Sequence, residues 1–246
     1  MNQLFKPFLR QSYWTGDVHT AAKHLLGRIS IEQKPVHVVT LTSEMVLHAI
    51  DKQEVMTAIL GSDFIVADTI SLTFWLKSHK IPVSRVTGID LAEQVIRHAN
   101  KPHVAIIGGS SDLVRTKAAQ KIYSFGGTTT VSEEGPRIFS YSATNDSELI
   151  AQLNDKKPLI ILVAFGHGKQ EWWISQIKKQ ITFPAIIIGV GGTLDVWGGE
   201  FMRAPHILQI LGFEWLWRLI QEPKRIRRII NAVVVFPYRA FLENLL

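Results

Sequence analysis

The sequence predicts an α/β protein with a Rossmann-like, largely parallel sheet flanked by helices. Two observations carry this prediction. Short, almost uninterrupted apolar runs of strand length alternate along the chain with segments of helical spacing, and several of these runs end at glycine or aspartate. Strands made of continuous Val, Ile and Leu are typical of parallel sheets whose two faces are both covered by helices.

Five apolar runs predict five strands, at residues 36–41, 63–67, 103–109, 158–165 and 184–189. Between them, helical spacing predicts helices at residues 43–51, 87–99 and 111–123, each with a Ser or Thr near its start that is suited to capping. Residues 165–175 predict a loop that enters a further helix. The glycine-rich and polar segment 126–136 is the best candidate for a mobile loop.

The last quarter of the chain predicts a helical appendage that is both basic and apolar. Residues 1–212 form the predicted α/β domain and residues 213–246 the appendage. Its helix, within residues 212–228, has an aromatic and aliphatic side and runs into a basic cluster, which suits a helix lying on an anionic membrane surface. A terminal helix packed on the core, with a solvated charged side, explains the same pattern equally well. The residues predicted to contact the membrane are Trp215, Trp217, Arg218, Arg225, Arg227 and Arg228.

Composition excludes several classes of protein. The chain of 246 residues has no cysteine, which excludes disulfides and thiolate metal sites. No apolar run approaches the roughly 20 residues of a membrane-spanning helix, and residues 1–10 are not expected to act as a signal peptide. The net charge of +6 favours an acidic partner. Nucleic acid is disfavoured because no aromatic-basic strand motif or helix-turn-helix is present.

The histidines have no spacing typical of metal ligands, and no H-E-x-x-H, D-x-D or G-K-[ST] motif occurs. A metal site and P-loop chemistry are therefore not expected.

The predicted strands place several polar and glycine residues at one edge of the sheet. Ligands of parallel sheets bind beyond the carboxyl ends of the strands, where Thr40, Asp68, Gly108, Gly166 and Gly191 fall. Asp68 is the candidate general base, because partial burial at that edge raises a carboxyl pKa. Capping of the segment that follows is an equally good explanation for Asp68 on sequence alone.

Two glycine turns are candidates for holding phosphate. Gly191 and Gly192 follow a strand, so their backbone N–H groups have no Cβ between them and a diphosphate. Gly108 and Gly109 form a second such turn. An ordinary tight turn is the alternative at both places.

Five polar side chains complete the predicted site. Arg85 and Arg203 suit phosphate oxygens, with a solvated or ion-paired role as the alternative. Gln170 and Glu171 suit uracil or sugar groups, or else cap the first turn of a helix. Asp195 suits loop amides or a sugar hydroxyl, with helix capping as its alternative.

Taken in order, these segments resemble the WecG/TagA/CpsF family of glycosyltransferases over about residues 16–241. The resemblance rests mainly on residues 39–46 (VTLTSEMV), 85–91 (RVTGIDL), 166–171 (GHGKQE), 189–195 (GVGGTLD) and 203–205 (RAP). It implies inverting transfer of N-acetylmannosamine or a related sugar from a UDP-sugar to a polyprenyl-diphosphate-linked acceptor, in cell-envelope polysaccharide or teichoic acid synthesis.

The resemblance also implies roles and a location. The family's catalytic Asp maps onto Asp68, the Thr of its first strand onto Thr40, and the Arg before its Thr-Gly-x-Asp-Leu onto Arg85. It implies no cofactor or metal besides the UDP-sugar donor. Its C-terminal segment is linked to membrane association and to covering the active site, which implies a cytoplasmic protein peripheral to the inner face of the plasma membrane. Homo-oligomerisation stays open.

Three positions depart from the family's pattern. Thr42 stands where Asn is usual, Thr69 where Gly follows the catalytic Asp, and Gly168 where Pro is usual. All three are expected at the cleft, so the donor or acceptor is expected to differ from the usual one. A catalytically silent module that binds a nucleotide sugar is the alternative function.

Overall fold

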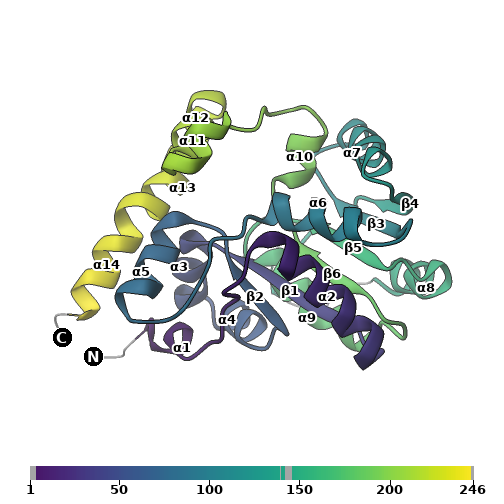
Figure 1. Ribbon diagram of the computed structural model, residues 1–246, viewed down its shortest axis with the longest axis horizontal. Helices are drawn as coiled ribbons and strands as arrows, with labels where there is room; N and C mark the ends of the chain where they lie inside the picture. Colours follow the sequence, from purple (N-terminus) through teal and green to yellow (C-terminus); the bar gives the residue numbers. More distant parts are fainter. Residues whose placement is uncertain (1–3, 139, 142–145, 245–246) are drawn as a thin grey trace.

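The computed structural model describes residues 4–138, 140–141 and 146–244. It confirms the predicted α/β architecture with one six-stranded, all-parallel sheet in the order β2-β1-β6-β5-β3-β4 (Figure 1). The strands are β1 (Val36–Leu41), β2 (Phe64–Ala67), β3 (His103–Gly108), β4 (Thr128–Glu133), β5 (Ile160–Ala164) and β6 (Ile186–Gly189). This order makes β2, β1 and β6 neighbours, so their carboxyl ends lie together.

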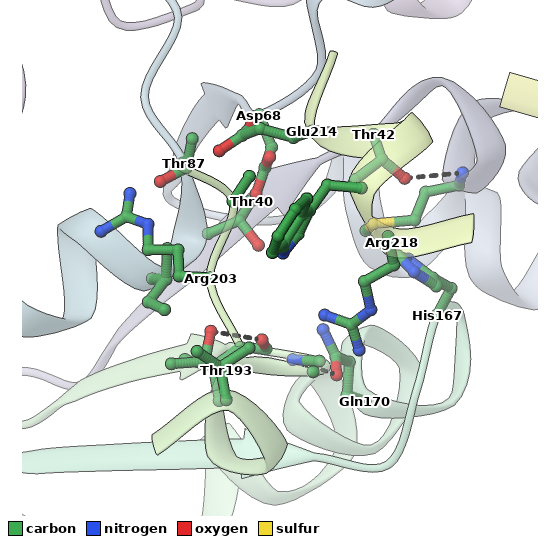
Figure 2. Close-up of a pocket in the computed structure, with 18 of the residues that line it drawn as sticks. Thr40, Thr42, Asp68, Thr87, His167, Gln170, Thr193, Arg203, Glu214 and Arg218 are labelled. Carbon is green, nitrogen blue, oxygen red and sulfur yellow. Dashed lines mark hydrogen bonds between the residues drawn. The ribbon is translucent and has the colours of Figure 1, made fainter. Parts of the chain in front are cut away.

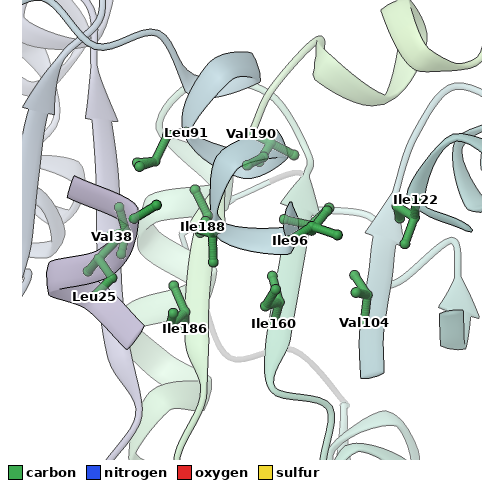
Figure 3. Packing of buried hydrophobic residues seen from close by; sticks show 14 of the residues in the cluster. Leu25, Val38, Leu91, Ile96, Val104, Ile122, Ile160, Ile186, Ile188 and Val190 are labelled. Atoms are coloured by element: carbon green, nitrogen blue, oxygen red, sulfur yellow. The ribbon is translucent and has the colours of Figure 1, made fainter. Parts of the chain in front are cut away.

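Helices cover both faces of the sheet, because successive strand side chains point to opposite faces. Val36 and Val38 face one cluster of buried residues, whereas Val39 and Leu41 face another. The first face is covered by α2 (Val18–Glu32), α6 (Gly88–His98), α7 (Asp112–Ser124) and α10 (Thr193–Trp197). Figure 3 shows Leu25 of α2 and Ile96 of α6 packed onto strand residues such as Ile188.

The second face has more and shorter helices. They are α1 (Lys6–Leu9), α3 (Ser43–Asp51), α4 (Gln53–Leu60), α5 (Ile70–Ser78), α8 (Ser147–Lys156) and α9 (Lys169–Ile177), with a 3₁₀ turn at Lys178–Gln180. Their buried residues form two clusters, one under α1, α3, α4 and α5 and one under α8 and α9.

Side-chain caps fix the start of the three predicted helices. The hydroxyl groups of Thr42, Thr87 and Ser111 accept backbone N–H bonds from Met45, Asp90 and Val114 at the first turns of α3, α6 and α7. These bonds satisfy donors that a helix start leaves unpaired. The predicted bounds of these helices therefore hold within about one residue.

The prediction of a mobile loop at residues 126–136 is wrong, because β4 lies there. Thr128–Glu133 pairs in parallel with β3 as an edge strand, with a register shift opposite Val104 and Ala105. Of its six residues only Val131 is buried. An edge strand with little core contact has no apolar run, so it lacks the signal that identified the other five strands.

The predicted C-terminal helix is interrupted. The tail consists of α11 (His206–Leu211), α12 (Glu214–Gln221), a 3₁₀ turn at Pro223–Arg225, α13 (Ile226–Ile230), a π-helical turn at Asn231–Val235 and α14 (Phe236–Asn244). Proline has no backbone N–H and disfavours a helical residue before it, so α12 ends before Pro223, with Glu222 at φ −130° and ψ 75°.

The tail lies along α5 and α3, and its far end is fastened to the α/β body (Figure 1). Phe236 is fully buried, with its ring 5.7 Å from that of Phe5 and 5.6 Å from that of Trp75. Among the described residues, no helix combines the length and apolar character needed to cross a bilayer.

Candidate active site

Two neighbouring cavities open above the carboxyl ends of β1, β2 and β6. The smaller has a volume of about 240 Å³ and the larger about 510 Å³. Both are lined by Thr42, Asp68, His167, Glu214 and Arg218. Asp68 thus lies where the two cavities adjoin, which is the position that a group acting on two substrates must occupy.

The cavities differ in their walls. The smaller cavity alone is lined by Thr40, Gln170, Gly191, Gly192, Arg203 and Trp217, among others. The larger cavity alone is lined by Arg85 and Arg228 and by apolar residues of α5 and the tail, including Ile70, Phe74, Trp215, Ile229 and Val233. The first therefore suits a polar, anionic ligand, and the second a ligand with an anionic end and an apolar part.

Asp68 follows β2 and is held at the start of α6. Its Oδ2 accepts a hydrogen bond of 2.8 Å from the Gly88 N–H. Burial raises the pKa of Asp68 to about 6; the Gly88 bond and the nearby Arg85 lower this pKa, whereas Glu214 and Asp90 raise it. A carboxylate with this pKa is ionised at neutral pH and still basic enough to take a proton. Capping of α5 does not explain Asp68, because Thr69 is the N-cap residue there.

Thr40 lies beneath Asp68 and joins two strands. Its hydroxyl group donates a hydrogen bond of 2.9 Å to the Gly189 carbonyl of β6. A Cβ at Gly88 would lie only 3.1 Å from the Thr40 Oγ1, so α6 approaches β1 closely because residue 88 is glycine. Thr40 therefore lines the cavity and also fixes the spacing between Asp68 and the turn after β6.

That turn is supported by a chain of three hydrogen bonds, two of them buried. The Gly191 N–H donates to Gln170 Oε1 at 3.1 Å, Gln170 Nε2 donates to Glu171 Oε1 at 2.7 Å, and the Gly168 N–H donates to Glu171 Oε2 at 2.8 Å. Glu171 is fully buried, and burial raises its pKa to about 7. Gln170 lines the smaller cavity, whereas Glu171 lines neither cavity and positions Gln170 and the turn.

Arg218 is the cation nearest to the glycine turn. A Cβ at Gly192 would lie 2.9 Å from Arg218 Nη2, so the guanidinium group rests directly on this glycine. Arg218 Nε pairs with Glu222 at 2.7 Å, and its Nη2 is buried without a hydrogen-bond partner. Figure 2 shows the guanidinium group beside Gln170, inside the cavity. A buried cationic donor without a partner is a ready contact for an anionic ligand.

Four of the residues predicted to contact the membrane line the cavities instead, and the prediction is corrected for those four. They are Trp215, Trp217, Arg218 and Arg228, and Arg228 also pairs with Glu44 of α3 at 2.8 Å. Arg227 is exposed, and the side chain of Arg225 lies outside the described part of the structure. The outward side of the tail instead carries exposed apolar residues, namely Phe213, Leu216, Ile220, Ile230, Val234, Tyr238 and Phe241.

The second glycine turn lies outside both cavities. A Cβ at Gly108 would lie 2.5 Å from the Ala164 carbonyl oxygen, so this glycine allows β3 and its neighbour β5 to pack closely. Gly109 packs against Arg115 and Leu194. The prediction of Gly108 and Gly109 as part of the ligand site is corrected here, because β5 separates β3 from β6 in the sheet.

The remaining predicted residues are placed as follows. Arg203 lines the smaller cavity and pairs with Asp90 of α6, with 2.6 Å between Nη2 and Oδ1. Asp195 lies in the first turn of α10, lines neither cavity, and its Oδ1 is buried without a hydrogen-bond partner. Arg85 lines the larger cavity.

The three departures from the family pattern each have a local role. Thr42 caps α3, and the Thr69 hydroxyl group accepts the Ser43 N–H bond at 3.1 Å, which fastens α5 to α3. Gly168 has φ +79°, a conformation that proline cannot adopt. The 166–168 loop thus differs in backbone path from one that contains proline, and it presents His167 to both cavities.

Sequence reasoning did not single out Glu214 or His167, and it expected Arg218 at the membrane, whereas the structure has Arg218 in the walls of both cavities. The available signal was the spacing in α12: residues 214, 217, 218 and 221 share one side of a helix, while 213, 216 and 220 share another.

No group of three or more histidine or carboxylate side chains is placed to hold a metal ion in the part of the chain that the structure describes. A family model described as Glycosyl transferase WecG/TagA/CpsF family matches residues 8–246, nearly the whole sequence.

Proposed function

The chain belongs to the WecG/TagA/CpsF family of glycosyltransferases, and we propose that it transfers N-acetylmannosamine or a related sugar from a UDP-sugar to a polyprenyl-diphosphate-linked sugar. The product would enter cell-envelope polysaccharide or teichoic acid synthesis. The observation that carries this proposal is the position of Asp68, which lines both a polar cavity at a glycine turn and a larger cavity with apolar walls.

The smaller cavity is the proposed donor site. The diphosphate of the UDP-sugar binds beside Gly192, where the Arg218 guanidinium group rests and supplies positive charge. Gly191 shapes the turn at φ +50°, but its N–H group already donates to Gln170. Positive charge fixed at a leaving diphosphate stabilises the transition state without a metal ion.

The larger cavity is the proposed acceptor site. Its apolar walls from α5 and the tail suit the first part of a polyprenyl chain, and Arg85 and Arg228 suit the diphosphate. The acceptor sugar then reaches toward Asp68, where the two cavities adjoin.

Asp68 is the proposed general base of a single displacement. It takes the proton from an acceptor hydroxyl group while that oxygen attacks the anomeric carbon of the donor sugar. The bond between the anomeric carbon and the diphosphate oxygen breaks, UDP leaves with the electron pair, and the configuration at the anomeric carbon is inverted. A well-placed base of this kind contributes about 10²–10⁴-fold to the rate.

The outward side of the tail is the proposed membrane-contacting surface. Exposed apolar side chains there, such as Phe213, Leu216 and Ile220, lie beside exposed bases such as Lys224 and Arg227. Such a surface suits the interface of an anionic bilayer. The protein would then act as a peripheral enzyme at the inner face of the plasma membrane, where its lipid-linked acceptor lies.

The test is a screen of UDP-sugars against a short-chain polyprenyl-diphosphate-GlcNAc analogue, with the product read by mass and its anomeric configuration by NMR. We expect one UDP-sugar to give an inverted disaccharide product. UDP binding without transfer from any donor would instead support the silent nucleotide-sugar-binding module. A retained configuration would contradict the single displacement.

A further inference from the structure

Arg85 is occupied by acceptors from within the protein. Its Nε donates to the Asp68 carbonyl at 2.9 Å, its Nη1 donates to the Gln209 carbonyl at 3.2 Å, and its Nη2 pairs with Glu214 Oε2. Gln209 and Glu214 both belong to the tail. Of these three acceptors only Glu214 is charged, so the tail supplies an anion that pairs with Arg85, in addition to the nearby Asp68 carboxylate.

The other two arginines that line the larger cavity also have carboxylate partners. Arg218 pairs with Glu222 and Arg228 with Glu44. The Arg218–Glu222 pair lies within one helix, and Glu222 lines neither cavity. Glu214 differs, because its carboxylate joins the tail to the segment that leads into α6 and lines both cavities.

The Arg85–Glu214 pair is open to competition from the cavity. The side chains of Arg85 and Glu214 are 24% and 28% exposed, so solvent and dissolved anions reach them. A partly solvated ion pair of this kind costs less to separate than a fully buried one. Glu214 contacts Arg85 through one oxygen, whereas a diphosphate carries more charge and can form two bonds to a guanidinium group, which makes it the stronger partner.

We propose that Glu214 is a built-in competitor for a diphosphate at Arg85, and that the diphosphate of the acceptor binds by displacing the Glu214 carboxylate. The identity of the anion as the acceptor's diphosphate rests on the proposed function, whereas the competition itself requires only a diphosphate group. Displacement frees the first residue of α12, the helix that also carries Arg218 into the donor cavity. Binding of the acceptor is thereby linked to the position of Arg218 in the donor cavity.

The competition is tested with inorganic pyrophosphate as the probe, measured by titration calorimetry on the full chain without any sugar donor. Glu214→Gln removes the competing charge and keeps the side-chain shape. We expect it to bind pyrophosphate about fivefold more tightly than the unmodified protein, the value expected if a partly solvated ion pair no longer competes.

Glu93→Gln is the matched control, because Glu93 pairs with Arg97 on the surface of α6 and its loss changes the net charge equally. We expect this control to bind pyrophosphate like the unmodified protein. In the Arg85→Gln background the gain from Glu214→Gln is expected to vanish, and melting temperatures verify folding. Should Arg85→Gln not fold, Arg85→Lys replaces it, and the gain is expected to shrink because lysine lacks the guanidinium fork.

An unchanged or lower affinity in Glu214→Gln, or a gain that persists without Arg85, overturns the proposal. Because the titration involves no transfer, it remains decisive even if the donor screen finds no product. Conversely, if transfer is confirmed but Glu214→Gln does not bind pyrophosphate more tightly, the competitor role of Glu214 is overturned and the proposed function still stands.

Discussion

Replacement of Asp68 by asparagine separates the chemistry of the site from its geometry. The asparagine side chain has nearly the same shape, and its oxygen still accepts the Gly88 N–H bond that Asp68 accepts at 2.8 Å. It has no basic oxygen to take the proton of an attacking hydroxyl group. We therefore expect turnover to fall by about 10²–10⁴-fold, while UDP affinity stays within about twofold because the diphosphate contacts lie at Gly192 and Arg218.

The same replacement is expected to stabilise the fold. Burial raises the pKa of Asp68 from its ordinary 3.8 to about 6, which corresponds to about 3 kcal/mol of unfavourable ionisation in the folded state. The folded protein binds this proton more tightly than the unfolded chain does, so the cost is complete above about pH 6 and disappears as the pH falls below about 4. Partial solvent access to Asp68 lowers the expected gain in unfolding free energy to about 1–3 kcal/mol at neutral pH.

Three measurements check this prediction. The first is the pH dependence of kcat/KM for the unmodified enzyme, which is expected to fall below about pH 6 as Asp68 becomes protonated. The others are single-turnover transfer and urea unfolding of Asp68→Asn at neutral pH and near pH 4. Asp155→Asn, at a carboxylate of α8 whose ion pair with Lys156 is exposed on both sides, is the control and is expected to leave turnover unchanged and to alter stability by less than about 0.5 kcal/mol.

Near-normal turnover in Asp68→Asn would refute the assignment of the base. An acid limb of kcat/KM near pH 4 would show that Asp68 is not desolvated as the structure indicates. A loss of stability in the variant at neutral pH would show that the carboxylate is compensated by contacts other than those of Gly88 and Arg85.

Four further predictions test the rest of the site. Arg218→Ala is expected to weaken UDP binding about tenfold by calorimetry, because a guanidinium–diphosphate contact is lost, whereas the exposed Arg227→Ala is expected to change nothing. Gly168→Pro is expected to lower the free energy of unfolding, measured in urea, by about 3 kcal/mol or more, because φ +79° is inaccessible to proline. Its control is Gly27→Ala in α2, where the added Cβ meets no atom within 4 Å. This control is expected to raise the free energy of unfolding by about 0.5–1 kcal/mol. Turnover is expected to be unchanged by EDTA, since Arg218 supplies the charge at the diphosphate, and a loss restored by a divalent cation would contradict this. The pair Leu216→Asp and Ile220→Asp is expected to reduce co-sedimentation with anionic vesicles at least about tenfold, while Tyr123→Asp, exposed on α7 at the other end of the molecule, leaves it unchanged (Figure 1).

The core of the fold was predictable because most of its strands are buried on both faces. Residues 36–41 are buried without exception, and so are residues 186–189. Such strands must be apolar throughout, which is the pattern that the sequence displays. β4 is an edge strand with one buried residue, so its sequence is not required to be apolar and contains no apolar run.

The candidate site was predictable only where neighbouring strands supply it. Asp68, Thr40 and Gly191 lie at or just after the carboxyl ends of β2, β1 and β6, which are adjacent in the sheet. Composition and periodicity identify strands but not their order, so nothing in the sequence distinguished these ends from that of β3. Gly108 and Gly109 were therefore predicted for the site, although β5 keeps them from it.

The tail shows most clearly what a sequence pattern leaves undecided. Aromatic and basic residues on a terminal helix predict a membrane surface, but the pattern does not say which side of the helix faces the body. In α12 the side with Glu214, Trp217 and Arg218 faces the cavities, and the side with Leu216 and Ile220 faces outward. One short helix is therefore suited to two tasks. Its inner side places the Arg218 cation in the proposed donor site, and its outer side offers apolar residues to the membrane that would hold the acceptor. A change on the outward side should then alter vesicle binding without altering UDP affinity, and a change at Arg218 should do the reverse.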